Sequence, residues 1–297
     1  MRRTPVGLLS GTVSVTTRWE GKVADMLPRA LNHMAVPGLR WDAFLDLARA
    51  LGCVGVEFRN DLPAPLFNGD APAEVRRRAK TFDIRILALA EVKAFNDWSD
   101  AKHAEAEALM QVAVACGAEA ISLIPRNDGL GCGNGERQAN LRVALRELQP
   151  MLAAHGLVGL IEPLGFEVCA LRHKAEAVDA IEALGATGTF RLVHDTFHHT
   201  LAGGGPIFAA HTGIVHISGV TDPSLAVSEM RDEHRVLVDR DDRLGNVAQI
   251  EALQLAGYTG PISFEPFAPS VHAITDPARE LDGSFQFICS RLAEMAA

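Results

Sequence analysis

Short runs of apolar residues recur along the chain, and each is separated from the next by a longer stretch of mixed polar and apolar residues. Within a run the apolar residues are nearly continuous and do not alternate with polar ones, which is typical of parallel strands buried on both faces. The expected strands are 28–33, 53–59, 84–90, 118–125, 157–162, 190–195, 213–219 and 260–266.

The stretches between these runs have the spacing of amphipathic helices. In residues 41–51 the apolar positions fall on one helical face, and 102–116 and 138–155 give longer patterns of the same kind. Several patterns end at a glycine directly after their last apolar position, as many helices do. These glycines are Gly52, Gly117, Gly156, Gly185 and Gly257. The repeated order of helix, glycine and strand predicts βα units.

Eight strands that alternate with helices in 297 residues, without a low-complexity linker, predict a single α/β domain, a (β/α)8 TIM barrel over residues 27–297. A doubly wound open sheet is the alternative, but it would want a G-x-G-x-x-G turn after the first strand, where the chain has Leu31-Asn-His-Met34. The glycine-rich segment 129–135 lacks a P-loop lysine, and we interpret it as a flexible loop. Residues 1–26 show no helical period, and we interpret them as an N-terminal extension, with an arm onto a neighbouring subunit as the alternative.

Composition narrows the classes of partner. Hydrophobic residues make up 48% of the chain and charged residues 22%, as in a globular protein with a sizeable core. The net charge of −9 argues against a nucleic-acid partner, because that affinity rests largely on Lys and Arg. The five cysteines form no C-x-x-C pair, which fits a reducing compartment. Since no apolar stretch is long enough for a membrane span, we expect a cytoplasmic protein without a membrane partner.

Ionisable residues stand at the ends of the last four expected strands. Glu162 ends the fifth strand, Asp195 ends the sixth, His216 lies in the seventh, and Glu265 ends the eighth. A single such charge would be read as a cap or an ion pair. In a barrel, however, the carboxyl ends of the strands carry the active site, so these four side chains would crowd together and require a compensating cation.

Three carboxylates and one imidazole suit one divalent ion, either Mn²⁺, Co²⁺, Mg²⁺ or Zn²⁺. Such an ion acts as a Lewis acid on a carbonyl and a neighbouring hydroxyl and so stabilises a developing enediolate. Glu162 and Glu265 would flank the substrate as general base and general acid. The expected reaction is proton abstraction next to a carbonyl.

Four segments resemble motifs of the xylose-isomerase-like TIM-barrel superfamily. They are Ile161-Glu-Pro-Leu-Gly165, Asp195-Thr-Phe-His198, Val215-His-Ile217 and Phe264-Glu-Pro-Phe267. Within the superfamily the chain is most similar to the 2-keto-myo-inositol isomerases (inosose isomerases), from about residue 29 to the end. The segments that support this likeness are Leu31-Asn-His-Met-Ala-Val-Pro37, Val56-Glu-Phe-Arg59, Glu162-Pro-Leu-Gly-Phe-Glu-Val-Cys169 and Asp232-Glu-His-Arg-Val236.

The resemblance implies that Glu162, Asp195, His216 and Glu265 bind the metal, that Glu162 and Glu265 also transfer protons, and that His198 and Arg235 contact the substrate. The chain departs from the family pattern after the seventh strand. Where members usually have a Pro-Gly-x-Gly loop, it reads Leu237-Val-Asp-Arg-Asp-Asp-Arg-Leu-Gly245, and these charges are candidates for altering the pocket rim or the substrate.

Further residues near strand ends are candidates for the pocket. His33 and Glu57 are expected to bind substrate, with a hydrogen-bond network across the barrel mouth as the alternative, and Arg59 is expected to pair with Glu57 or a neighbouring acid. His194 should face the helices, because it precedes Asp195 by one position on a strand. Candidates for apolar walls around a sugar ring are Trp41, Trp98, Phe58, Phe95, Phe166, Phe197 and Phe267.

The sequence therefore predicts a metal-dependent isomerase of a small keto-polyol, most similar to the inosose isomerases of inositol catabolism. A ketose 3-epimerase or an inosose dehydratase on the same scaffold are the alternatives. An endonuclease IV-like phosphodiesterase is less consistent with the net charge, and a non-catalytic sugar-binding barrel is the remaining alternative. The amphipathic helix expected near 278–296 would close the barrel or join a homo-oligomer contact.

Overall fold

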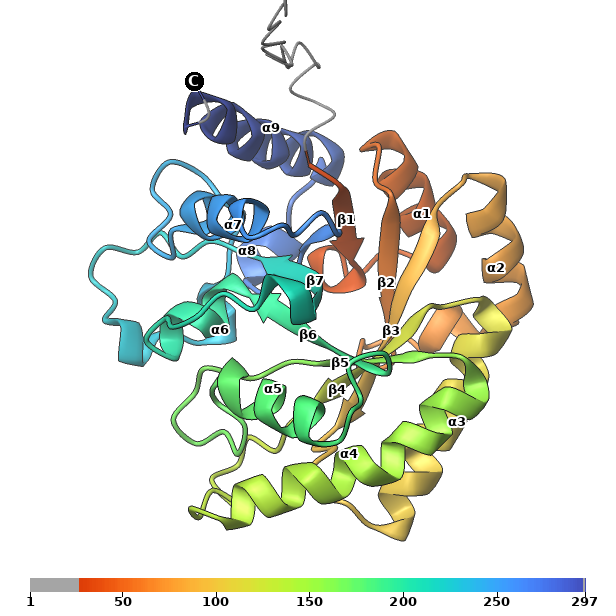
Figure 1. Ribbon diagram of the computed structural model, residues 1–297. Helices are drawn as coiled ribbons and strands as arrows, with labels where there is room; N and C mark the ends of the chain where they lie inside the picture. The colour runs from red at the N-terminus through yellow and green to blue at the C-terminus, as the bar shows by residue number, and fades with distance from the viewer. Residues whose placement is uncertain (1–26, 296) are drawn as a thin grey trace, which may run out of the picture.

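A computed structural model describes residues 27–295 and 297 of the chain, so the expected extension 1–26 lies outside the described residues. The described chain forms a closed barrel of eight parallel strands in the order β1 to β8 (Figure 1). The strands are β1 (Arg29–Asn32), β2 (Gly55–Arg59), β3 (Arg85–Lys93), β4 (Ala120–Ile124), β5 (Val158–Ile161), β6 (Phe190–Asp195), β7 (Thr212–Ile217) and β8 (Ile262–Phe264). The predicted (β/α)8 barrel is confirmed.

Helices surround the barrel on its outside (Figure 1). They are α1 (Trp41–Ala50), α2 (Pro72–Thr81), α3 (Asp100–Cys116), α4 (Glu136–His155), α5 (Lys174–Ala183), α6 (Thr196–Leu201), α7 (Asn246–Leu255), α8 (Pro269–His272) and α9 (Pro277–Met295). All five glycines predicted to end helices have positive φ, for example 80° at Gly117, a conformation that glycine adopts without steric cost. The glycine-rich segment 129–135 leads into α4. The side-chain oxygen of Gln138, in the first turn of this helix, accepts from the Gly135 N–H at 2.7 Å.

Two apolar layers hold the fold together. The larger one fills the space between the strands and the helices, and it includes the α1 face predicted from the sequence: Phe44, Leu45, Ala48 and Leu51. The smaller one lies inside the barrel and contains Ala30, Leu87, Ala88, Ala120, Leu160, Val193 and Ile214. Since apolar side chains fill this part of the barrel, it is a packed core and not a pore.

The last helix packs over β1 and β8, the two strands whose pairing closes the barrel. In α9, Phe285 packs edge-on against Phe264 of β8, with ring centroids 4.6 Å apart, and Asp282 forms an ion pair with Arg29 of β1 at 2.9 Å. Figure 1 shows α9 beside β1, where the described chain begins. The helix therefore covers the seam where the barrel closes, and its expected contact with another copy stays a prediction.

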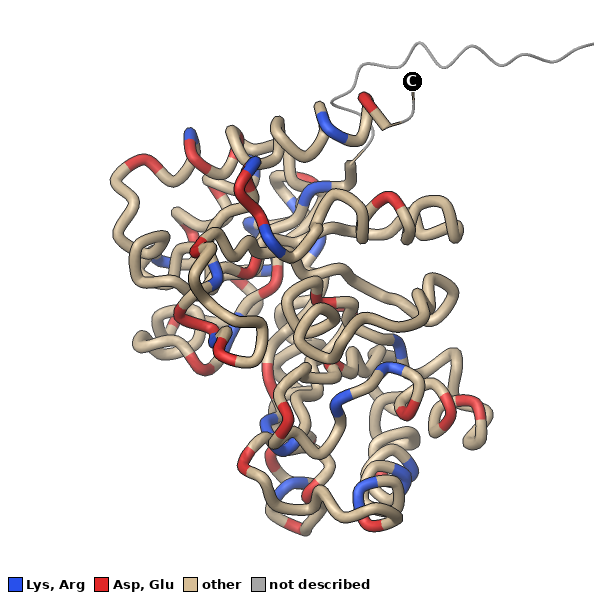
Figure 2. Tube along the Cα trace, turned by 90° about the vertical axis from the view of Figure 1, so that its left-hand side faces the viewer, with Lys and Arg blue, Asp and Glu red and all other residues tan. Residues whose placement is uncertain are grey.

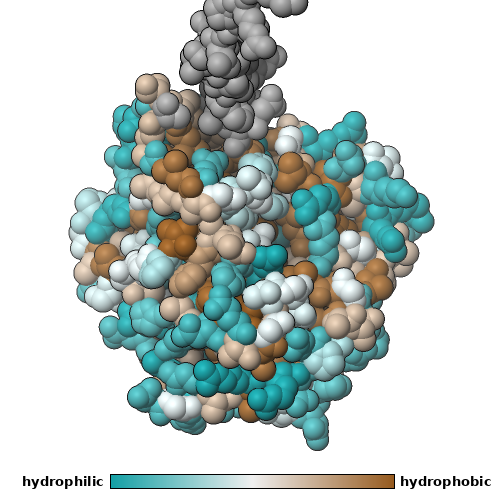
Figure 3. Space-filling model, in the orientation of Figure 1, coloured by the Kyte–Doolittle hydropathy of each residue, from teal (hydrophilic) through white to brown (hydrophobic). Residues whose placement is uncertain are grey.

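The outer surface is mixed in character. On the face in Figure 3, hydrophilic residues cover most of the area and hydrophobic ones form small separate groups. In the view of Figure 2, basic and acidic residues are interspersed along the trace. No helix among residues 27–295 is long and apolar enough to cross a membrane.

Candidate metal centre

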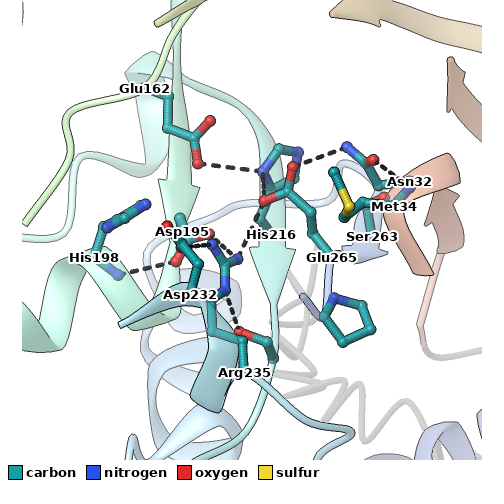
Figure 4. A network of polar contacts seen from close by, with 12 residues as sticks. Asn32, Met34, Glu162, Asp195, His198, His216, Asp232, Arg235, Ser263 and Glu265 are labelled. Carbon is teal, nitrogen blue, oxygen red and sulfur yellow. Dashed lines mark hydrogen bonds and ion pairs between the residues drawn. The ribbon is translucent and has the colours of Figure 1, made fainter. Parts of the chain in front are cut away.

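The four ionisable residues singled out at the strand ends meet at one point. Three of them follow an inward-facing apolar residue by two positions: Leu160 precedes Glu162, Val193 precedes Asp195, and Ile214 precedes His216. Glu265 follows the buried Ser263 at the same spacing. Because side chains on a strand alternate between its two faces, the second residue also points into the barrel. Ligand atoms of Glu162, Asp195, His216 and Glu265 all lie within 4.8 Å of one another (Figure 4), and all four residues are buried.

His216 lies at the centre of this group and is held from behind by Glu57. Its Nε2 is 3.0 Å and 3.2 Å from the two carboxylate oxygens of Glu57, a wholly buried residue of β2. Its Nδ1 is 3.4 Å from Glu162 Oε1 and 3.2 Å from Glu265 Oε2, the separations of an ion pair, yet it makes no hydrogen bond. Glu57 therefore fixes the ring so that Nδ1 faces the other three residues.

Glu265 is bound on both of its carboxylate oxygens. Its Oε1 accepts from Asn32 Nδ2 at 3.1 Å and from Arg59 Nη1 at 2.6 Å, while Oε2 accepts from Arg235 Nη2 at 3.1 Å. Burial alone would raise the pKa of Glu265, but His216, Arg235 and Arg59 outweigh it and hold that pKa well below its usual range. Glu265 is thus a fixed carboxylate.

Asp195 is bound by the next turn of chain and by the same arginine. Its Oδ1 accepts from the backbone N–H of His198 at 2.9 Å, capping α6, and its Oδ2 accepts from Arg235 Nη2 at 2.6 Å. Burial opposes the charge, but Arg235 and His198 lower the pKa of Asp195 overall. Arg235 is itself only 1% exposed and is anchored by Ser218 Oγ at 2.9 Å, so it connects two carboxylates of the group.

Glu162 is the least tethered of the four. Among the described residues its carboxylate has only His216 Nδ1 as a polar partner. Burial and the charge of Glu265 raise the pKa of Glu162 to about 7. Burial also opposes a charge on His216, but Glu265, Glu57 and Glu162 together raise its pKa well above the usual value.

The residues present fit a divalent cation. Three carboxylates gather around an imidazole nitrogen that lacks a hydrogen bond, and a carboxylate holds the other nitrogen of that ring. This is the arrangement in which proteins fix the tautomer and orientation of a metal-binding histidine. Oxygen ligands with one imidazole suit Mg²⁺, Mn²⁺, Co²⁺ or Zn²⁺.

A cavity of about 450 Å³ opens beside this group, and we call it the substrate cavity. Glu162, His198, Arg235 and Glu265 line it, as predicted for a pocket at the carboxyl ends of the strands. Of the aromatic candidates, Phe166 and Phe267 line it, while the other five lie in the packed core or beside other elements. Polar side chains from the ends of β2 and β3 and from the loops after β2 and β4 complete the wall: Arg59, Asp61, Glu91, Lys93, Arg126, Asn127 and Asp128. Such a wall suits a ligand rich in hydroxyl groups.

Two residues expected to bind substrate, Glu57 and His33, do not line the substrate cavity. Glu57 lies behind His216 and also accepts from Ser263 Oγ at 2.6 Å, so we revise its role from substrate contact to support of the histidine. His33 stacks on Phe44 with ring centroids 4.3 Å apart, and its Nε2 bonds the carbonyl of Leu39 at 3.0 Å. That place follows because the chain turns at the end of β1 and directs His33 into the apolar layer under α1.

His194 faces the helices, as expected for the residue before Asp195. Its ring is wholly buried between Lys174 of α5, 2.7 Å from Nδ1, and Gln249 of α7, 2.9 Å from Nε2.

Two polar residues of the centre, Asn32 and Ser263, were not identified from the sequence, and the role of Arg59 was identified only in part. Arg59 does pair with neighbouring acids, Asp61 at 2.7 Å and Glu91 at 3.4 Å, but it also reaches Glu265 across the barrel. The signal for Asn32 is its place two residues after the inward-facing Ala30, the same spacing that identifies Asp195. Ser263 carried no such signal, since its neighbour in the centre, His216, is adjacent only through the register of β7 with β8.

In the charged loop after β7, the side chains of Asp242 and Arg243 form hydrogen bonds with backbone groups. Asp242 accepts from the N–H groups of Leu244 and Asn246 at 3.1 Å and 2.9 Å, which caps α7. Arg243 donates to the carbonyls of Asp222 and Leu225. The described lining of the substrate cavity is made by other residues, so these charges shape the loop and do not form the pocket rim.

The chain is similar to known proteins in sequence and in fold. Residues 45–291 match the family described as xylose isomerase-like TIM barrel. A comparison with curated proteins finds no match. Among solved structures, a xylose isomerase domain containing protein from Salmonella typhimurium LT2 is 29% identical, with a TM-score of 0.83 over 91% of this chain and 98% of that one.

Two further solved structures share the fold at lower identity. The IolI protein, solved with a bound zinc atom, is 18% identical, with a TM-score of 0.78 over 90% of this chain and 99% of that one. An L-ribulose 3-epimerase is 17% identical, with a TM-score of 0.65 over 92% of this chain and 98% of that one.

Proposed function

Because the chain belongs to the xylose isomerase-like TIM-barrel family, we propose that it is a divalent-metal-dependent isomerase of a keto-polyol, with 2-keto-myo-inositol as the expected substrate. One observation carries the proposal: three buried carboxylates converge on His216 Nδ1, a nitrogen without a hydrogen bond, and two of them, Glu162 and Glu265, line an open polar cavity. The zinc atom in the IolI protein supports a divalent ion at such a centre.

The residues that would hold the ion are Glu162, Asp195, His216 and Glu265. When bound, a divalent ion would polarise the substrate carbonyl and the hydroxyl beside it. Arg235 and His198 line the same cavity and would position the substrate oxygens. Arg235 cannot leave the centre readily, because Asp195, Glu265 and Ser218 hold its guanidinium.

Glu162 is suited to move the proton. It lines the substrate cavity, has one polar partner among the described residues, and has a pKa raised towards neutrality, whereas Glu265 is held by three hydrogen bonds. In the proposed reaction Glu162 takes the proton from the carbon next to the carbonyl, which gives the enediolate. A proton then returns to the former carbonyl carbon, the hydroxyl proton moves to the other oxygen, and the carbonyl shifts by one ring carbon with no net loss of atoms.

The proposal is tested by proton exchange. The protein is incubated with Mn²⁺ and 2-keto-myo-inositol in D₂O and followed by NMR. We expect a new inosose isomer with deuterium at the carbon next to the carbonyl. Glu162→Gln should abolish exchange, while the matched control Glu119→Gln, an exposed residue paired with Arg85 before β4, should not. If metal-loaded protein exchanges no proton on any inosose or ketose tested, the isomerase proposal is wrong.

A ketose 3-epimerase is the second candidate, favoured by the shared fold with the L-ribulose 3-epimerase. It would exchange the proton at carbon 3 of an open-chain ketose and invert that centre without moving the carbonyl. The same experiment with D-fructose and L-ribulose distinguishes the two reactions, and loss of water from the inosose would instead indicate a dehydratase.

A further inference from the structure

A second cavity lies behind the metal centre. It measures about 180 Å³ and is enclosed by the loop after β5, the first turn of α5, the end of β6 and the loop after α6. The residues that matter for its chemistry are Arg172, Lys174, Ala175, His198, His199 and Gly204. His198 lines this cavity and the substrate cavity alike, so the two spaces share one side chain. We call it the Lys174 cavity.

Lys174 supplies a positive charge without an acidic partner. Its Nζ lies 2.7 Å from His194 Nδ1, and among the described residues no carboxylate is within ion-pair distance of it. Because His194 Nε2 faces the amide oxygen of Gln249, that nitrogen carries the proton, and Nδ1 accepts from Lys174. Two further N–H bonds of the ammonium group are left for a ligand. Burial lowers the pKa of Lys174 to about 7, and the more distant charge of Asp195 offsets only part of that effect.

The first turn of α5 adds backbone donors. This helix has ten residues and begins at Lys174, and its N-cap residue, His173, makes no capping hydrogen bond through its side chain. Lys174 and Ala175 both line the cavity, so the positive end of the helix faces it. Uncapped N–H groups and the helix dipole together favour an anion at this position.

Two imidazoles in the wall also lack partners. His198 is only 4% exposed, and its Nδ1 has no hydrogen-bond partner. The buried Nδ1 of His199 is likewise without a partner. A buried polar atom with no partner is costly, and each unsatisfied one in a folded protein points to a missing ligand, ion or water. These two residues are independent of the helix end, yet both line the same cavity.

We propose that the Lys174 cavity binds a compact oxyanion, of the phosphate or carboxylate class, between the Lys174 ammonium group, the first turn of α5 and the imidazoles of His198 and His199. The one carboxylate that lines the cavity, Asp195, does not prevent this, because its oxygens already accept from the His198 N–H and from Arg235. The oxyanion is either free or a substituent of the molecule in the substrate cavity. Because His198 lines both cavities, a bound oxyanion would contact a residue that also lines the substrate cavity.

The test measures binding and requires no turnover, so it can fail or succeed independently of the proposed isomerase reaction. Inorganic phosphate is titrated into the full-length protein by calorimetry, with equal metal content in all variants. We expect saturable binding that Lys174→Met weakens about tenfold or more, the size of a lost charge-assisted hydrogen bond. Lys80→Met, which removes the same charge from the exposed end of α2, should leave it unchanged.

Two additional measurements make the result decisive. Lys174→Arg should retain most of the affinity, which separates loss of charge from damage to the fold, and circular dichroism checks that each variant is folded. Inositol 1-phosphate distinguishes the sources: tighter binding than inorganic phosphate identifies a substituent of the ligand, and equal binding identifies a free anion. The proposal is overturned if neither compound shows saturable binding, or if folded Lys174→Met binds phosphate as well as the unchanged protein does.

Discussion

Glu57→Gln tests whether the wholly buried carboxylate behind His216 tunes the metal centre. Glutamine has the same shape, so its carbonyl oxygen can still accept from His216 Nε2, and its NH₂ group can donate to Ser263 Oγ, now 2.6 Å from the carboxylate. What the substitution removes is the negative charge that keeps the imidazole basic. The expected change is therefore in metal affinity and not in the fold.

The magnitude follows from the position of Glu57. A carboxylate that holds the second nitrogen of a metal-binding histidine is typically worth a factor of about 10 to 100 in metal affinity. That corresponds to about 1.4 to 2.7 kcal/mol of binding free energy. The two carboxylate oxygens of Glu57 lie 3.0 Å and 3.2 Å from His216 Nε2, and the residue is 0% exposed. Because water does not screen this charge, we expect Glu57→Gln to weaken metal binding by a factor within that range.

The assay is calorimetric titration of Zn²⁺ and of Mn²⁺ into chelator-treated protein. Ser263→Ala is the matched control, since it removes one hydrogen bond to Glu57 but leaves its charge, and it should change the affinity less than Glu57→Gln does. If folded Glu57→Gln binds both ions as tightly as the unchanged protein, then Glu57 does not set the properties of His216, and our assignment of its role is wrong.

Two other substitutions probe the loops around the centre. In Gly165→Ala the new Cβ would overlap the carbonyl oxygen of His198 and lie 2.6 Å from Leu201 Cβ, so α6 must shift. We expect a loss of about 1–3 kcal/mol in the free energy of unfolding in urea, together with a lower kcat, while Gly188→Ala, which meets nothing within 4 Å, leaves both unchanged. Asp242→Ala removes the cap of α7 and should cost about 1–2 kcal/mol without altering the ratio of kcat/KM between inosose and ketose, with the exposed Asp241→Ala as control. A changed ratio would show that the charged loop after β7 selects the substrate.

The fold and the four central residues could be predicted because one rule governs both. Parallel strands that are buried on both faces read as apolar runs, and in a barrel their carboxyl ends meet at one mouth. An ionisable residue directly after a run is therefore placed by the fold itself. Asp195 and His216 also pair in register on neighbouring strands, which brings them to the same level of the barrel.

The supporting residues could not be predicted in the same way, because their roles depend on contacts across the barrel. Glu57 faces the centre on β2, but only the geometry of the closed barrel places it against His216 and not against substrate. His33 follows β1 by one residue, and the turn after that strand directs it into the core. In both cases the sequence identified a residue near the mouth but could not distinguish support from contact with the ligand.

The structure also separates the two carboxylates that the sequence treated alike as a proton-transfer pair. Glu265 accepts from Asn32, Arg59 and Arg235, so moving it towards a substrate carbon would break two buried ion pairs and a buried hydrogen bond at once. Among the residues that the structure describes, Glu162 loses only its contact with His216 Nδ1 when it moves. A base that must approach one carbon and then another needs this freedom, whereas a carboxylate that fixes an ion needs the opposite. The distribution of hydrogen bonds therefore assigns proton transfer mainly to Glu162 and the holding of charge mainly to Glu265.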